Sequence, residues 1–202
     1  MTPKQKERIQ QKIKKLKSAL AADKRFWHGF HHDGRGLRYA IPQLYIQLQD
    51  YTGAMRYFIW FSKNFPDDAC YTEFLFEWTL VLFYKGKTKE AEGKAWESFC
   101  SNVSVFDKFF GRAITPLDES DQSNHEANYI DNYFKYSAMQ PELADFADWL
   151  NEFEQTEKFE HASRDFIGIQ KQLNSTNDFR LRGKLYKLKS ALQSLFKVNR
   201  FE

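Results

Sequence analysis

Apolar residues recur at intervals of three and four along most of the chain, which is the spacing of one face of an α-helix. Runs that alternate apolar and polar residues, as a half-buried strand does, are few. The pattern therefore predicts an all-α protein. Residues 1–26 are rich in lysine and predict a basic helix that stops near Asp23. The apolar stripe of this helix consists of Ile9, Ile13, Leu16 and Leu20.

Turn residues and helical spacing alternate through the next part of the chain. Glycines make residues 27–36 a predicted loop. Two helices joined by a turn at Asp50 should follow it. A third helix is predicted over residues 72–84 and a fourth over residues 88–99, with Gly86 in the turn between them. Because short turns join antiparallel neighbours, these helices should form two hairpins.

The second part of the chain begins with a polar connection over residues 111–124, which we take as the main internal boundary. Residues 125–202 then predict helices that pack on the same core. Three helical faces are marked by Ile130, Tyr133, Phe134 and Ser137, by Leu143, Phe146, Leu150 and Phe153, and by Phe159, Ala162, Phe166, Ile169 and Leu173. A last helix should start after Asn177 or Asp178. Its predicted seam consists of Leu181, Leu185, Leu188, Leu192 and Leu195.

One region carries a family resemblance. Residues 49–58, together with the Phe-Pro-Asp-Asp sequence at 65–68, resemble the second half of a tetratricopeptide repeat. The unit at residues 35–68 has the 34-residue period of that family. Pro42 and Phe61 depart from its pattern, because the family has small residues at those two positions. Proline at that point should kink the helix unless the helix begins there.

A second unit resembles the family through Gly86 in its turn and through Ala91, which lies 37 residues after Ala54. The small residue allows the two helices of a hairpin to cross closely. The resemblance covers residues 35–99. It implies that residues 35–110 form two antiparallel hairpins, stacked into a short right-handed solenoid that the flanking helices complete.

The resemblance implies a non-catalytic module or adaptor that binds another protein or peptide. In that family, fixed positions of each unit's first helix line the inner groove. On this chain they are Tyr39, Gln43, Ile46, Gln47, Phe76, Leu80, Phe83 and Tyr84. The partner contacts expected among them are Tyr39, Gln43, Gln47, Phe76, Phe83 and Tyr84. None of these positions has the Lys, Arg or Asn of a carboxylate clamp. The groove should therefore hold an apolar helical ligand or, slightly favoured, the chain's own carboxy-terminal helices.

Charge adds a second hypothesis. The formal net charge is only +3, but nine basic residues lie between Lys4 and Arg25 and seven between Arg180 and Arg200. Residues 118–165 hold thirteen acidic residues between these two basic segments. The basic terminal helices could bind nucleic acid or an acidic partner. Alternatively they are solvated helix faces, or lie near the acidic segment and cancel its field. The sequence is also compatible with a homo-oligomer.

Composition and the amino-terminal sequence indicate where in the cell the protein should be found. No uninterrupted apolar stretch reaches the length of a membrane helix, and residues 1–20 lack the apolar core of a secretory signal. We therefore expect a cytoplasmic protein without a membrane partner. Cys70 and Cys100 should be reduced structural thiols. The 20 Phe, 10 Tyr and 5 Trp predict an aromatic core.

Catalytic and metal-binding motifs are weak. The densest set of potential metal ligands is His28, His31, His32 and Asp33. Adjacent histidines suit one tetrahedral centre poorly, and no cysteine pair supports them, so we expect neither a metal nor another cofactor. Neither cysteine, nor any serine, lies in a nucleophile motif. The sequence therefore favours a binding protein over an enzyme.

Overall fold

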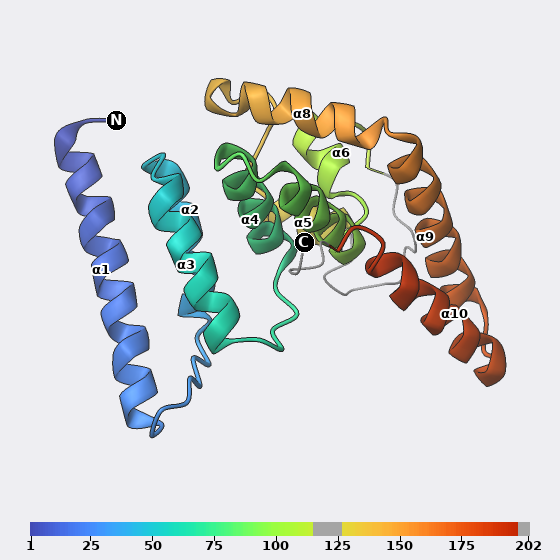
Figure 1. The fold of residues 1–202 in the computed structure, drawn as a ribbon, viewed down its shortest axis with the longest axis horizontal. Helices are drawn as coiled ribbons and strands as arrows, with labels where there is room; N and C mark the ends of the chain where they lie inside the picture. The colour runs from blue at the N-terminus through green and yellow to red at the C-terminus, as the bar shows by residue number, and fades with distance from the viewer. Residues whose placement is uncertain (115–126, 198–202) are drawn as a thin grey trace.

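The computed structural model describes residues 1–114 and 127–197, and every regular element in these ranges is a helix, as predicted (Figure 1). The helices are α1 (Pro3–Phe26), α2 (Ala40–Gln47), α3 (Tyr51–Asn64), α4 (Thr72–Tyr84), α5 (Thr88–Ser101), α6 (Val105–Phe110), α7 (Ala127–Tyr133), α8 (Ala144–Glu154), α9 (Glu157–Ser175) and α10 (Phe179–Gln193). The 3₁₀ turns η1 (Leu37–Tyr39) and η2 (Pro141–Leu143) precede α2 and α8.

Local capping chemistry explains several helix boundaries. The Asp50 carboxylate accepts a 2.8 Å hydrogen bond from the backbone N–H of Gly53 at the start of α3, and the Asp178 side chain caps α10. Gly86 has φ +68° in the turn between α4 and α5, the left-handed conformation that favours glycine. Helix α1 continues past Asp23, near which its stop was expected, and ends at Phe26, within the predicted range 1–26. The Asp23 carboxylate instead accepts from backbone amides of the following loop.

Other boundaries differ from the sequence predictions. Pro42 lies in the first turn of α2, where its missing N–H costs no helical hydrogen bond, so it causes no kink. Helix α6 was not predicted, and α7 ends at Tyr133, so Phe134 and Ser137 follow this helix rather than continue it. The predicted connection at residues 111–124 lies mostly outside the described residues.

The centre of the fold is the α4–α5 hairpin (Figure 1). Helix α4 is buried on nearly all sides, as expected of a helix with apolar residues around its whole circumference. Helices α2 and α3 pack beside it, with α1 outermost, while α8 runs across the hairpin. Helix α9 then leads away from α8, and α10 returns along α9. One continuous cluster of buried side chains extends from Ile13 in α1 to Phe196 after α10.

The predicted leucine seam of α10 is only partly buried. Leu185 packs against Ile169 and Leu173 of α9. By contrast, Leu181, Leu188 and Leu195 are 39%, 55% and 43% exposed. The predicted seam is therefore not buried as a whole, because along most of its length α10 has a single neighbouring helix, α9.

Gly93 lets the carboxy-terminal segment approach α5. A Cβ atom at this position would lie 2.8 Å from the Phe196 carbonyl oxygen, closer than van der Waals contact allows. We expect Gly93→Ala to lower the free energy of unfolding by about 1–3 kcal/mol, since the backbone at Phe196 must move. Gly168→Ala in α9 is the control, because a Cβ there meets no neighbour within 4 Å.

The control should raise the free energy of unfolding by about 0.5–1 kcal/mol, the usual gain when alanine replaces glycine inside a helix. Urea unfolding followed by circular dichroism measures both values. Equal stabilisation by the two substitutions would contradict the close approach at Phe196.

Candidate functional site

The predicted groove positions on α4 are covered by the chain itself. Phe76 is fully buried and packs edge-on against Phe146 of α8, with ring centroids 5.4 Å apart. Phe83 stacks on Trp149 of α8 at 5.1 Å. The Tyr84 hydroxyl donates a 2.7 Å hydrogen bond to the backbone carbonyl of Glu142. Phe76 therefore presents no surface to a partner, and we withdraw it from the expected contacts.

The predicted partner contacts on η1 and α2 do not form a common surface with those on α4. Tyr39 is half-buried, and its hydroxyl donates a 2.5 Å hydrogen bond to Asp68. Gln43 is half-buried, whereas Gln47 is exposed. Only the two glutamines keep polar side chains that a partner can reach without displacing a tertiary contact. The six predicted residues consequently do not form one open groove.

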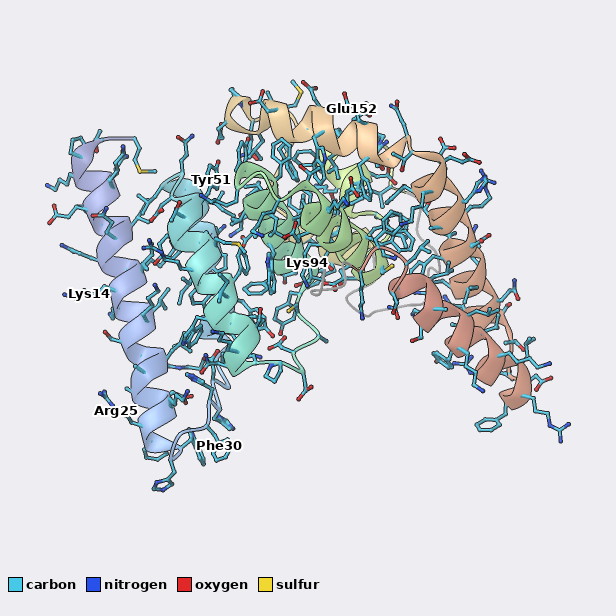
Figure 2. All side chains as sticks on the ribbon, in the orientation of Figure 1. Lys14, Arg25, Phe30, Tyr51, Lys94 and Glu152 are labelled. Atoms are coloured by element: carbon cyan, nitrogen blue, oxygen red, sulfur yellow. The ribbon has the colours of Figure 1, made fainter. Side chains whose placement is uncertain are left out.

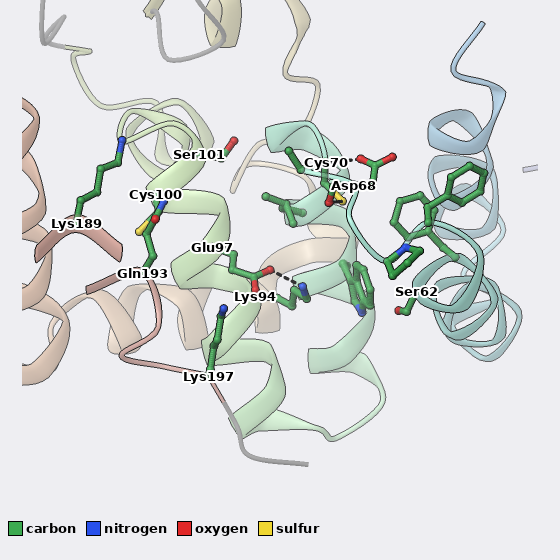
Figure 3. A pocket seen from close by; sticks show the side chains of 16 residues that line it. Ser62, Asp68, Cys70, Lys94, Glu97, Cys100, Ser101, Lys189, Gln193 and Lys197 are labelled. Atoms are coloured by element: carbon green, nitrogen blue, oxygen red, sulfur yellow. Dashed lines mark hydrogen bonds and ion pairs between the residues drawn. The ribbon is translucent and has the colours of Figure 1, made fainter. Parts of the chain in front are cut away.

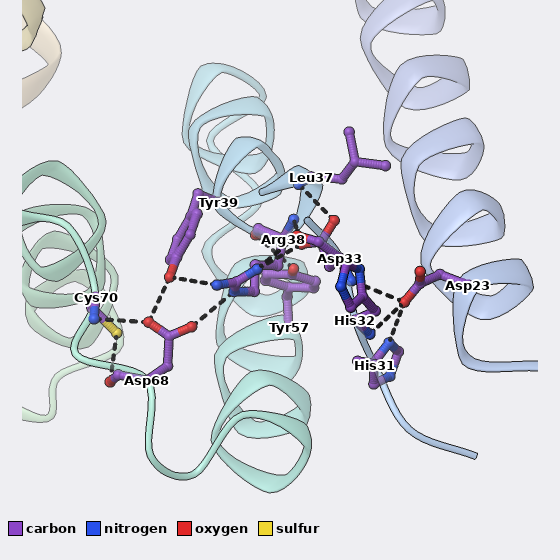
Figure 4. Close-up of polar contacts among 10 residues, drawn as sticks. All are labelled: Asp23, His31, His32, Asp33, Leu37, Arg38, Tyr39, Tyr57, Asp68 and Cys70. Carbon is purple, nitrogen blue, oxygen red and sulfur yellow. Dashed lines mark hydrogen bonds and ion pairs between the residues drawn. The ribbon is translucent and has the colours of Figure 1, made fainter. Parts of the chain in front are cut away.

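Arg38 ties the loop before α2 to the loop after α3 (Figure 4). Its guanidinium donates to Asp68 at 2.8 Å, to Asp33 at 3.0 Å and to the Tyr39 hydroxyl at 2.9 Å. Burial would raise the pKa of Asp68, but hydrogen bonds from Tyr39, the Cys70 amide and Arg38 lower it. Every charge in this network has a partner, so the network holds the two loops together rather than offering a reactive group.

A cleft of about 790 Å³ lies between the loop after α3 and helices α4, α5 and α10 (Figure 3). One part of its lining is aromatic and consists of Phe61, Phe65 and Trp78. Three lysines also line it, namely Lys94, Lys189 and Lys197. We call this the lysine cleft. It lies against α3 and α5, the second helix of each hairpin, and against Trp78 of α4, whereas none of the predicted groove residues lines it.

The three lysines of the cleft differ in their partners. Lys94 pairs with Glu97, and its ammonium group lies 4.2 Å from the centroid of Trp78. Lys189 donates a 3.0 Å hydrogen bond to the neutral side chain of Gln170, and burial lowers the pKa of its ammonium group. Lys197 is exposed. Among the described residues, neither Lys189 nor Lys197 has a carboxylate partner, so both can receive an anionic group.

Both cysteines line the lysine cleft as free thiols. Burial raises the pKa of Cys70 to about 12 and raises that of Cys100 as well. A thiol must ionise to act as a nucleophile, so both are poor candidates at neutral pH. The cleft therefore offers charge and apolar surface rather than an activated nucleophile.

The potential metal ligands at residues 28–33 do not converge on one point. His32 stacks on Trp27 with ring centroids 5.0 Å apart, whereas Asp33 binds Arg38. The His31 ring packs against the rings of Trp60 and Phe65. Across residues 1–114 and 127–197, no three His, Cys, Asp or Glu side chains are grouped so that they could hold a metal. Nor does any helix in these ranges have the length and apolarity to cross a bilayer.

The basic terminal helices lie at opposite ends of the molecule (Figure 1). Lys14 and Arg25 point away from the body of the fold (Figure 2). In the described part of the chain, no ion pair connects a lysine or arginine of α1 or α10 to the acidic helices α8 and α9. Side-chain pairing therefore does not cancel the charge of these two helices.

The lysine cleft combines residues between Phe61 and Ser101 with residues 189–197, and no motif in the sequence indicated it. Lys189 belonged to the predicted basic face of the last helix, but nothing in the sequence linked it to Lys94 or Trp78. Comparisons with protein-family models, with curated proteins and with solved structures found no match. The assignment of a function therefore rests on the geometry and on the sequence pattern.

Proposed function

We propose that this chain is a non-catalytic helical module that binds an acidic segment of another protein in the lysine cleft. The observation that carries the proposal is the cleft itself, whose lining includes both aromatic side chains and two lysines that lack a carboxylate partner among the described residues. An acidic segment with one aromatic or aliphatic side chain matches both features.

We also propose that the two hairpins are tetratricopeptide-like repeats, with α2–α3 and α4–α5 as the units. Ala54 and Ala91 support this assignment, because both are fully buried where the family has its small residues. Helix α8 covers the side of α4 that would line the inner groove. The partner would then bind on the opposite side, against the second helices α3 and α5.

A protein segment suits the cleft better than nucleic acid does. Only two lysines of its lining lack a carboxylate partner among the described residues, too few for the row of phosphate contacts by which proteins hold a nucleic-acid backbone. Nucleic-acid binding by the basic residues of α1, and by those of α10 other than Lys189, is the second candidate. It predicts a binding surface outside the cleft, so the two candidates can be separated by where a substitution has its effect.

The first test neutralises the two lysines of the cleft that lack a carboxylate partner. The probe is a fluorescein-labelled decapeptide with five Glu residues around a central Phe, measured by fluorescence anisotropy. We expect Lys189→Gln/Lys197→Gln to weaken binding at least about tenfold, since two charge contacts of about 0.7 kcal/mol each are lost. Replacing the central Phe with Ser should also weaken binding, because the aromatic part of the lining then has no partner.

The matched control is Lys4→Gln/Lys14→Gln, which removes the same charge from the exposed side of α1. It should leave peptide binding within about twofold, because neither lysine lines the cleft. A 20-nucleotide single-stranded DNA serves as the second probe. Tighter binding of the DNA than of the peptide, with loss on the α1 control substitution, would overturn the proposal in favour of the second candidate.

A further inference from the structure

A second, smaller pocket lies between α1 and α3 and shares no residue with the lysine cleft. Its volume is about 290 Å³, which is near the lower end of the range for small-molecule sites. Leu20, Tyr57 and Trp60 give it a largely apolar lining. The His31 side chain also lines it, and we call it the His31 pocket.

His31 is an unusual residue for such a position. Its side chain is only 3% exposed, and neither ring nitrogen has a hydrogen-bond partner. The nearby Asn64 amide is already engaged, because it accepts from Lys24 and donates to the Trp60 carbonyl. A buried polar group without a partner costs about 1–3 kcal/mol, so the fold retains His31 here at the expense of stability.

The protonation state of His31 follows from its surroundings. Burial, and then the charge of Lys24, lower its pKa, so the ring is neutral at pH 7. The Asp23 carboxylate lies 3.9 Å from Nδ1, beyond hydrogen-bond distance (Figure 4). Neither nitrogen is engaged, so the neutral ring keeps one free N–H and one free lone pair. The ring can therefore accept a hydrogen bond from an N–H or O–H group in the pocket.

Three cations complete the pocket, and none of the residues that line it is acidic. Lys17 donates to the Tyr45 hydroxyl at 2.7 Å, and Lys24 donates to Asn64 at 2.8 Å. Arg56 is exposed. No ion pair involves any of the three cations within the described residues. The pocket thus combines positive charge with flat aromatic walls.

We infer that the His31 pocket binds a planar aromatic carboxylate whose ring carries an N–H or O–H donor. The ring lies against Trp60 and Tyr57, the donor reaches His31, and the carboxylate lies near Lys17, Lys24 and Arg56. Each property of this ligand class matches one property of the pocket. A compact inorganic anion would leave the apolar lining unused, and a neutral aromatic would leave the three cations without a partner.

The experiment uses the full chain and isothermal titration calorimetry with three probes. These are indole-3-acetate, its N-methyl analogue, and 3-methylindole, which has no carboxylate. Wild-type protein should bind indole-3-acetate about tenfold more tightly than the N-methyl analogue, because the analogue cannot donate to His31. In His31→Phe this difference should disappear.

Two further variants separate the charge from the hydrogen bond. Arg56→Gln should weaken indole-3-acetate binding severalfold and leave 3-methylindole unchanged. Lys12→Gln on the exposed side of α1, outside the pocket, should change neither. Thermal unfolding checks the fold, and His31→Phe should be at least as stable as wild type because it removes the unpaired polar ring.

A Gly-Gly-Trp peptide with a free carboxylate tests the other source of the same chemistry. His31-dependent binding of this peptide identifies the carboxyl terminus of a partner protein, whereas binding of indole-3-acetate alone identifies a free metabolite. The inference is overturned if no probe binds at millimolar concentration. It is also overturned if His31→Phe still distinguishes indole-3-acetate from its N-methyl analogue.

Discussion

Replacing Trp96 with alanine is expected to lower the free energy of unfolding by about 3–5 kcal/mol, the range for removal of a large buried aromatic side chain. Trp96 is fully buried in α5. Its ring packs against Phe159 and Phe166 of α9 and against Phe196 beyond α10. Its Nε1–H donates a 2.8 Å hydrogen bond to the Leu192 carbonyl of α10. One side chain therefore holds both carboxy-terminal helices to the central hairpin.

Two measurements distinguish this role from a general loss of stability. Urea unfolding gives the free energies, and limited proteolysis with trypsin reports whether α10 separates first, since that helix contains several exposed basic residues. Trp96→Phe keeps part of the ring contacts but loses the hydrogen bond and some packing volume, so it should cost less, about 1–3 kcal/mol. Equal losses for the two substitutions, or proteolysis that starts elsewhere, would contradict the assigned role.

The sequence predicted those parts of the fold that local chemistry determines. The predicted range of the third helix matches α4 at both ends, because a proline-containing turn precedes it and Gly86 follows it. Asp50 was predicted as a cap or turn residue, and Asn177 or Asp178 as the cap of the last helix. Asp50 and Asp178 are the caps, since each side chain accepts from amides two or three residues away. Such signals act within a few residues, so one sequence is enough to show them.

Features that depend on contacts between distant segments were not predicted. The spacing of the leucines in α10 is helical, but only the arrangement of the neighbouring helices decides that Leu188 is exposed while Leu185 is buried. The coverage of Phe76 by α8 likewise depends on where α8 packs. The lysine cleft and the His31 pocket likewise depend on how distant segments pack. The sequence grouped His31 with its neighbours in the chain, whereas the structure places it beside Trp60 in α3.

The stability of the protein should fall as the pH rises from about 4.5 to about 8, and Glu77 should be the main single cause. Its carboxyl group is fully buried in α4, and burial raises its pKa from 4.5 to about 8. In this interval the folded protein keeps a proton on Glu77 that the unfolded chain has lost. Because the unfolded state then binds fewer protons, the free energy of unfolding falls with increasing pH, by about 3–5 kcal/mol in total.

Glu77→Gln should remove this dependence, because an amide of similar shape does not titrate. The variant should exceed wild type in free energy of unfolding by about 2–4 kcal/mol at pH 8.5, with little difference at pH 4.5. Glu152→Gln, on the exposed side of α8, is the control and should change stability by less than about 0.5 kcal/mol. Urea unfolding at several pH values between 4.5 and 9 gives all three curves.

Tyr136 provides an independent check of the same cause. Its hydroxyl donates a 2.7 Å hydrogen bond to the Glu77 carboxyl group, which favours the charged form and holds the pKa below the value that burial alone would give. In Tyr136→Phe the pKa of Glu77 should therefore rise further, and the fall in stability should extend to higher pH. A variant whose curve ends at the same pH as wild type would show that the hydroxyl does not control this proton. If the free energy of unfolding of wild type is constant from pH 4.5 to 8 and equals that of Glu77→Gln, Glu77 does not have the raised pKa that the prediction requires.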